Sequence, residues 1–262
     1  MATQIGAQMY TIRDFCKTPA DIAKSCERLK KIGYGAVQAS ALGPIEPTEL
    51  RKILDDHGLV CAATHRGLDQ MKDVEKISDE HKALGCELTA IGGFGWNGPA
   101  KDEWLKFCSD YNALAKPLAA KGLKIGYHNH SHEFSPFGLT DNPAGISPRE
   151  VPQQVLLDNL QEPVWFEIDT YWVQHGGADP AEWIEKCAGR LPAIHLKDIT
   201  ISPKREHKMC EVGSGNINWK RVLEAAKKAG VKWYLVERDS GDLDPFESLK
   251  ISYERLRGWG LS

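Results

Sequence analysis

A helix, a glycine, a short strand and a polar end follow one another within residues 102–130, DEWLKFCSDYNALAKPLAAKGLKIGYHNH. The amphipathic segment Asp102–Lys121 predicts a helix that ends at Gly122, because glycine accepts the left-handed conformation that closes a last helical turn. The β-rich run Leu123–Tyr127 predicts the strand that follows, and His128-Asn129-His130 come directly after it. This order of elements defines one structural unit.

The same unit recurs along the chain. Other predicted helices, each followed by a glycine and a predicted strand, are Ala20–Ile32 before Ala36–Ala39, Pro47–His57 before Leu59–Ala63, Asp73–Leu84 before Glu87–Ile91, Asp179–Ala188 before Ala193–Leu196, and Trp219–Ala229 before Trp233–Val236. Two further apolar runs, Ile5–Tyr10 and Val164–Ile168, bring the predicted strands to eight. Short apolar strands that alternate with helices are typical of a parallel sheet covered on both faces.

Eight such units predict a closed (β/α)8 barrel, the TIM-barrel architecture of the α/β class, with an open doubly wound sheet as the alternative. The chain has 262 residues, close to the roughly 250 of one such barrel. Linkers and low-complexity tracts are absent from the sequence, so residues 1–262 are expected to form a single domain. The segment Ser135–Pro152, rich in proline and glycine, predicts a long loop above the barrel.

Charge and hydropathy exclude several classes of protein. The 33 Lys and Arg residues against 36 Asp and Glu give a formal net charge of -3, without the basic excess of a nucleic-acid-binding protein. The apolar runs are too short to span a membrane, and residues 1–4 lack the basic and apolar regions of a signal peptide. The seven cysteines form no Cys-x-x-Cys pair, which argues against a disulfide framework. We therefore expect a cytoplasmic protein.

Chemistry in a barrel of this type gathers where the strands end. Four consecutive predicted strands, the fifth to the eighth, finish in carboxylates and imidazoles. Their polar ends are His128–Glu133, Glu167–Asp169, His195–Asp198 and Glu237–Asp239, and the third strand adds His65. Candidate site residues are therefore expected at one end of the barrel.

Side-chain alternation sharpens this expectation. Because successive residues of a strand point to opposite faces, Asp169, His195 and Glu237 are predicted at matching heights on neighbouring strands. A pocket of carboxylates with one imidazole suits Mn²⁺ or Mg²⁺, and Co²⁺ or Zn²⁺ also fit such donors. The structural alternative is that single acidic residues at strand ends cap helices or form surface ion pairs, as we consider for Asp198 and Asp239.

Two further groups leave alternatives open. His128, His130 and His132 could be metal ligands, hydrogen-bond donors to a substrate, or supports for either. The turn Gly213-Ser214-Gly215 could bind a phosphate through backbone N–H groups. Its structural alternative is a plain turn, with Asn218 as the N-cap of the helix that follows.

At these residues the sequence resembles the xylose isomerase-like TIM-barrel superfamily, in the branch of the sugar phosphate isomerases and epimerases. The matching pieces are Tyr127-His128-Asn129-His130-x-x-Glu133-Phe134, Asp169-Thr170-x-Trp172, His195-Leu196-Lys197-Asp198, Glu211-Val212-Gly213-x-Gly215-x-Ile217 and Val236-Glu237-x-Asp239. The superfamily includes ketose 3-epimerases, hydroxypyruvate and rhamnose isomerases, inosose dehydratases, 3-keto-glycoside lyases and endonuclease IV.

The resemblance implies one divalent metal ion, Mn²⁺ first among the candidates, with ligands from strands five to eight. Asp169, His195 and Glu237 match three of the four positions. The first ligand is assigned to Glu133, as in the dehydratase-like branch. Ketose 3-epimerases carry it within strand five, where this chain has His128 or Asn129, so His128 or His130 are alternatives to Glu133.

The resemblance also implies a metal-dependent isomerase or epimerase that acts on a keto sugar or sugar phosphate through an enediolate. Glu133 and Glu237 are its expected catalytic base and acid. The expected substrate-binding residues are His65, His128, His130, Trp172, His175 and Lys197. The partner is a small-molecule sugar, and aromatic side chains in the loops suit either sugar stacking or a homodimer or homotetramer contact.

Other functions are kept as alternatives. A lyase or dehydratase acting on a 3-keto-glycoside or an inosose would use the same metal site. A non-catalytic sugar-binding barrel would bind without turnover. A phosphodiesterase like endonuclease IV would need further zinc ligands on the early strands, where this chain offers only His65.

Overall fold

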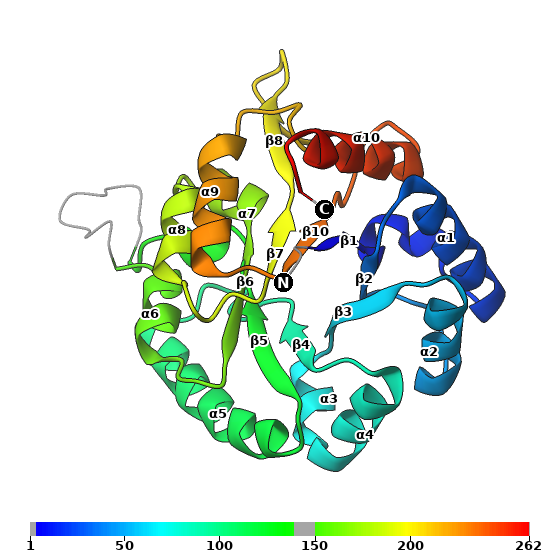
Figure 1. Ribbon diagram of the computed structural model, residues 1–262. Coiled ribbons are helices and arrows are strands. Elements are labelled where there is room, and N and C mark those ends of the chain that lie inside the picture. The colour runs from blue at the N-terminus through cyan, green and yellow to red at the C-terminus, as the bar shows by residue number, and fades with distance from the viewer. Residues whose placement is uncertain (1–3, 139–149, 262) are drawn as a thin grey trace.

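The computed structural model describes residues 4–138 and 150–261, which form a closed parallel barrel surrounded by helices (Figure 1). Around the barrel the strands follow the order β1-β10-β7-β6-β5-β4-β3-β2. Their bounds are β1 (Gln4–Gln8), β2 (Ala36–Ala39), β3 (Val60–His65), β4 (Leu88–Ile91), β5 (Lys124–His128), β6 (Trp165–Asp169), β7 (Ala193–Leu196) and β10 (Trp233–Val236). β1 pairs with both β2 and β10, so the barrel prediction is confirmed and the open-sheet alternative is wrong.

The helices form the outer layer of this single α/β domain. They are α1 (Pro19–Ile32), α2 (Pro47–Asp56), α3 (Leu68–Lys72), α4 (Val74–Leu84), α5 (Lys101–Ala120), α6 (Pro152–Asn159), α7 (Thr170–His175), α8 (Pro180–Lys186), α9 (Trp219–Ala229) and α10 (Pro245–Gly258). All six helices predicted from the sequence are confirmed, and their ends agree within about two residues. The additional helices are α3, α6, α7 and α10.

The α9 helix shows how the sequence determines these ends. The Asn218 side chain accepts a hydrogen bond from the Arg221 N–H and caps the start of the helix. Gly230 closes the other end in the left-handed conformation, at φ +82°, and its N–H donates to the Ala226 carbonyl. Both ends therefore lie where short polar and glycine signals predict them.

The interior of the barrel changes from apolar to polar along the strands. On β6, alternation turns Trp165, Glu167 and Asp169 to the same inward face. Trp165 lies in a buried cluster of mostly small side chains with Trp233 and Leu235. Glu167 and Asp169, further along the strand, are fully buried polar groups. The apolar layer thus closes one end of the barrel, and the polar groups lie toward the other.

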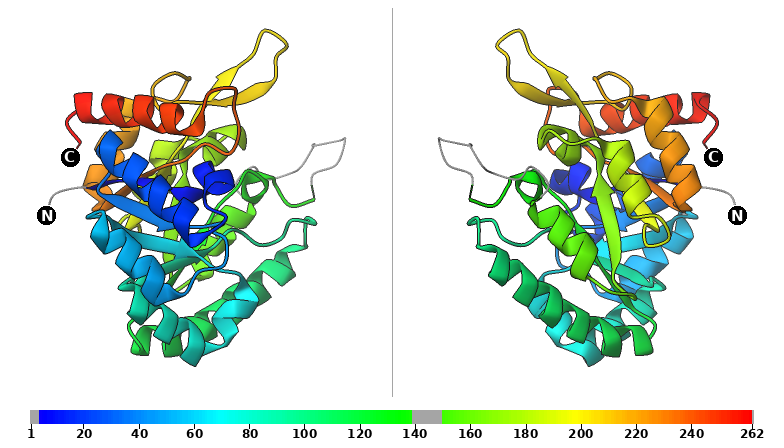
Figure 2. Two further views of the ribbon diagram at one scale, coloured as in Figure 1. Left: turned by 90° about the vertical axis from the view of Figure 1, so that its right-hand side faces the viewer. Right: turned by 90° about the vertical axis from the view of Figure 1, so that its left-hand side faces the viewer.

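A two-stranded hairpin interrupts the alternation of strands and helices after β7. Its strands, β8 (Asp198–Ile201) and β9 (His207–Cys210), pair antiparallel and project away from the barrel (Figure 2). The sequence did not predict this hairpin. Of the expected loop Ser135–Pro152, residues 139–149 lie outside the described part of the chain, and α6 begins at Pro152.

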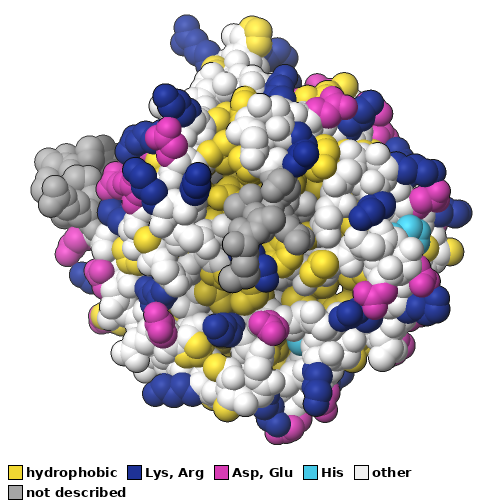
Figure 3. Space-filling view, viewed as in Figure 1, with side chains coloured by type: hydrophobic (Ala, Val, Ile, Leu, Met, Phe, Trp, Pro, Cys, Tyr) yellow, Lys and Arg dark blue, Asp and Glu magenta, His cyan; other side chains and the backbone are white. Residues whose placement is uncertain are grey.

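The surface carries charges of both signs, and on the face in Figure 3 the Lys and Arg side chains are interspersed with Asp and Glu. Among the described helices, not one is both long enough and apolar enough to cross a membrane.

A close contact at the apolar end of the barrel gives a test of the packing. A Cβ atom at Gly126 would lie 2.4 Å from the Trp165 ring, so Gly126→Ala forces the indole out of place. We expect a loss of about 1–3 kcal/mol in the free energy of unfolding, measured by urea denaturation. Gly258→Ala is the matched control, because a Cβ there meets no atom within 4 Å. Equal stabilities of the two variants would contradict this packing.

Candidate metal centre

Three of the predicted ligands converge at the polar end of the barrel. Asp169 ends β6 and His195 lies on β7, and the two residues are register partners of the parallel pair. Glu237 directly follows β10. Asp169 and His195 are 0% exposed and Glu237 is 7% exposed, so the prediction that the three side chains meet is confirmed.

The geometry of these three residues suits a cation. His195 Nδ1 lies 2.9 Å from Glu237 Oε2 and 3.7 Å from Asp169 Oδ2, and one donor atom from each residue lies within 4.8 Å of the others. These same three atoms are buried, and the polar groups that face them in the described part of the chain include one another and the Lys197 ammonium. An ion pair with one ammonium group leaves free lone pairs on both carboxylates, and a divalent cation would engage all three donor atoms at once. The residues present therefore fit a metal ion.

Lys197 balances the charge of this site. Its ammonium group is buried, 3.0 Å from Asp169 Oδ2 and 2.7 Å from Glu237 Oε2, and it donates hydrogen bonds to both Asp239 oxygens at 3.0 and 3.2 Å. Burial alone would lower the pKa of Lys197, but the three carboxylates outweigh it and raise that pKa. Lys197 therefore remains a cation.

The same interactions keep two of the carboxylates ionised. Burial raises the pKa of Asp169 and of Glu237, but the Lys197 ammonium and the His195 ring outweigh burial and hold both pKa values below their ordinary range. Ionised carboxylates are the form that binds a metal ion.

Glu133 lies outside this group of three. It belongs to the short 3₁₀ helix His132–Phe134 and is fully buried, which raises its pKa. Its Oε1 accepts a hydrogen bond from the Tyr127 hydroxyl at 2.8 Å, and its Oε2 accepts one from the His130 N–H at 2.8 Å. Both oxygens are thus already partnered, and the role of Glu133 as a fourth ligand stays a prediction.

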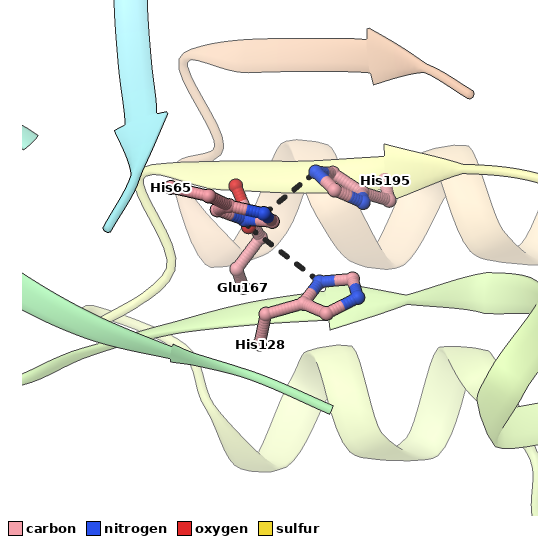
Figure 4. A group of neighbouring side chains, drawn as sticks. All are labelled: His65, His128, Glu167 and His195. Carbon is pink, nitrogen blue, oxygen red and sulfur yellow. Dashed lines mark hydrogen bonds and ion pairs between the residues drawn. The ribbon is translucent and has the colours of Figure 1, made fainter. Parts of the chain in front are cut away.

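A second group of side chains lies deeper in the barrel, around Glu167 (Figure 4). Glu167 Oε2 is 2.6 Å from His65 Nε2, 3.5 Å from His128 Nδ1 and 3.4 Å from His195 Nε2. Glu167 Oε1 accepts a hydrogen bond from the Gln38 amide at 2.8 Å. These four ionisable residues also offer metal-ligand atoms, but the carboxylate already has hydrogen-bond partners. The group of Asp169, His195 and Glu237 is the better candidate.

Two predicted substrate-binding histidines, His65 and His128, belong to the group around Glu167, and His130 lies next to His128. The His128 ring centroid is 5.2 Å from that of His65, 4.9 Å from that of His130 and 4.5 Å from that of His195. Burial lowers the pKa of His128, and it lowers the pKa of His130 to about 2, so both rings are neutral. A neutral imidazole can donate one hydrogen bond and accept another, as sugar hydroxyls require.

Aromatic rings extend this set toward the loops. The His130 ring is 5.1 Å from Trp172 and 4.7 Å from Trp96, and Trp172 is 5.5 Å from His175. Among the described residues, His130 Nδ1, Trp172 Nε1 and His175 Nδ1 find no hydrogen-bond partner. Trp172 and the histidines therefore offer both stacking surface and unused polar atoms.

Asp198 explains the turn that follows the hairpin. Its buried Oδ2 accepts hydrogen bonds from the Gly213 N–H at 2.8 Å, the Gly215 N–H at 3.0 Å and the Trp219 indole at 2.6 Å. The two glycine N–H groups thus already have an anionic partner. The phosphate hypothesis for this turn is wrong, and the alternative with Asn218 as N-cap is confirmed.

This arrangement predicts a structural role for Asp198. Asp198→Asn replaces one accepting oxygen by a donor, and we expect the free energy of unfolding to fall by about 2–4 kcal/mol because buried N–H groups lose their partner. Chemical denaturation measures the effect, with the exposed Asp242→Asn as the matched control. If the two variants were equally stable, the turn would not depend on Asp198.

A closed barrel with buried carboxylates and imidazoles at the carboxyl ends of its strands is the architecture of TIM-barrel enzymes. Within this class, the chain belongs to the xylose isomerase-like TIM barrel family, whose profile matches residues 26–259. The family predicted from the sequence is thus confirmed.

The curated relatives are named inosose dehydratases. That of Geobacillus thermodenitrificans is 28% identical over 164 residues, which cover 56% of this chain and 51% of the relative. The chain thus matches about half the length of this relative, whereas the match to the Erwinia tasmaniensis protein, 23% identical over 259 residues, covers 82% of each. A solved sugar phosphate isomerase/epimerase from Parabacteroides distasonis superimposes with a TM-score of 0.80 at 24% identity, over 100% of this chain and 96% of that one. That similarity supports the fold.

Proposed function

We propose that this protein is a divalent-metal-dependent isomerase or epimerase that acts on a keto sugar through an enediolate intermediate. The observation that carries the proposal is the convergence of Asp169, His195 and Glu237, which are buried and each offer one donor atom within 4.8 Å of the others. Two carboxylates and one imidazole suit Mn²⁺, and Glu133 is proposed as the fourth ligand. A cation held there supplies a Lewis acid for the negative charge that develops on the substrate carbonyl oxygen.

The chain's own residues supply proton transfer and orientation. Glu133 and Glu237 are the proposed base and acid that remove and return a proton at the carbon next to the carbonyl. Lys197 remains charged and can donate a hydrogen bond to a substrate oxygen. The unused polar atoms of His130, Trp172 and His175 can orient hydroxyl groups, and the His128 ring lies next to those of His65 and His130. Together these groups favour a hydroxylated substrate beside the metal.

Dehydration is the second candidate, and the curated relatives named inosose dehydratase support it. It begins with the same proton abstraction. If a leaving group on the β-carbon departs from the enediolate, the product is unsaturated, whereas return of the proton gives an isomer or an epimer. The two reactions share every residue named above, so the product distinguishes them.

Solvent exchange tests both candidates. The protein is stripped with a chelator, reloaded with Mn²⁺, and incubated in D₂O with a panel of keto sugars, their phosphates and keto-cyclitols. We expect deuterium at the carbon next to the carbonyl, only in the reloaded protein. A deuterated isomer or epimer supports the first candidate, and loss of water supports the second. Deuterium incorporation that is the same in the chelator-treated and the Mn²⁺-loaded protein would contradict the metal proposal.

Glu237 gives the matching mutational prediction. Glu237→Gln removes both a proposed anionic ligand and a proposed proton carrier. We expect turnover to fall by about 100- to 10,000-fold while the fold persists. Circular dichroism monitors the fold and product formation monitors turnover. Glu247→Gln, which changes an exposed residue of α10, is the control. Turnover retained in Glu237→Gln would remove this residue from the mechanism.

A further inference from the structure

The two nitrogens of His195 have different surroundings. Nδ1 faces the Asp169 and Glu237 carboxylates and makes no hydrogen bond to any described residue. Nε2 lies 2.6 Å from the Gln38 side-chain oxygen, Oε1. Which nitrogen carries the hydrogen decides which one can bind a metal, because a coordinating nitrogen needs its lone pair.

The orientation of the Gln38 amide is fixed from its other end. Its Nε2 lies 2.8 Å from Glu167 Oε1, and an ionised carboxylate can only accept hydrogen bonds. The other oxygen of Glu167, Oε2, lies 2.6 Å from His65 Nε2, so a ring nitrogen or an amide nitrogen faces each oxygen of this carboxylate. The amide nitrogen of Gln38 must therefore face Glu167, and the amide oxygen must face His195.

Gln8 supplies a second, independent anchor. Its side-chain oxygen accepts a hydrogen bond from the Tyr10 N–H at 3.2 Å, so its amide nitrogen is the atom that lies 2.8 Å from Gln38 Oε1. Gln8 and Gln38 are register partners on β1 and β2, and both are 0% exposed. Because Gln38 Oε1 has no hydrogen to give, the group that faces it on His195 must be an N–H.

We infer that Gln8, Gln38 and Glu167 are positioning residues that hold His195 with its hydrogen on Nε2 and thereby assign Nδ1 to the metal ion. The inference rests on the proposed metal centre. It adds a function for three buried residues on β1, β2 and β6, all of which lie outside the group of Asp169, His195 and Glu237. Partners of this kind typically change metal affinity about 10- to 100-fold when they are removed.

Removal of the acceptor is the first experiment. Gln38→Met keeps the length of the side chain but cannot accept from His195, and we expect its dissociation constant for Mn²⁺, measured by competition with a chelator, to rise about 10- to 100-fold. Gln153→Met is the matched control, because Gln153 is equally buried but makes no side-chain hydrogen bond within residues 4–138 and 150–261. The control should bind Mn²⁺ like the wild type.

A reversed pair of residues provides the rescue. Gln38→Glu alone sets two carboxylates about 2.8 Å apart and should bind metal weakly, whereas the double variant Gln38→Glu/Glu167→Gln restores every hydrogen bond with the donor and acceptor exchanged. We expect it to regain affinity within about threefold of the wild type. A folded double variant that still binds as weakly as Gln38→Met would overturn the inference.

Nitrogen-15 NMR of the wild-type protein loaded with Zn²⁺, a diamagnetic probe, shows which nitrogen of His195 carries the hydrogen, even if variants fail to fold. The inference expects a protonated Nε2 and a coordinated Nδ1 in His195, and the reverse assignment would overturn it. Failure of the wild type to bind either metal ion refutes the proposed metal centre itself. Wild-type binding together with unchanged binding in Gln38→Met refutes only the positioning role.

Discussion

The ion pairs of Lys197 are the interaction on which the polar end of the barrel depends. Its ammonium group is buried and lies 2.7–3.0 Å from oxygens of Asp169, Glu237 and Asp239. Carboxylates so close together and shielded from water would otherwise repel each other and take up protons. Because Lys197 holds Asp169 and Glu237 in their ionised form, they can face His195 as metal donors.

Along the strand direction, the barrel interior contains first a layer of hydrogen-bonded side chains and then the candidate metal site. The layer around Glu167 joins β1, β2, β3, β6 and β7 through side-chain hydrogen bonds, and its carboxylate and amide groups find partners among themselves. One step further along the strands, Asp169 Oδ2, His195 Nδ1 and Glu237 Oε2 converge, and Lys197 balances the charge of the two carboxylates. The hydrogen-bonded layer around Glu167 holds the side chain of His195 in a fixed orientation, as metal coordination requires of a ligand.

The regular part of the structure could be predicted because each signal is local. The glycine after each of the six predicted helices and the alternation of side chains along each strand depend on neighbouring residues only, and the parallel strand order then brings Asp169, His195 and Glu237 together. Helix α10 carried such a signal in Asp244-Pro245, where the Asp244 side chain caps the helix, but it was not predicted. The β8–β9 hairpin has no glycine in the turn between its strands, so its sequence lacks the usual signal of a hairpin.

The supporting residues could not be predicted because their partners are distant in sequence. In the sequence, Gly213 and Gly215 resemble an anion-binding turn. In the folded protein their N–H groups donate hydrogen bonds to the Asp198 carboxylate. Gln38 looks like an ordinary strand residue, and only barrel closure places it between Glu167 and His195, 129 and 157 residues further along the chain. Residue type and strand position thus indicate the candidate ligands, whereas the proposed choice of nitrogen on His195 depends on contacts that exist only after the barrel has closed.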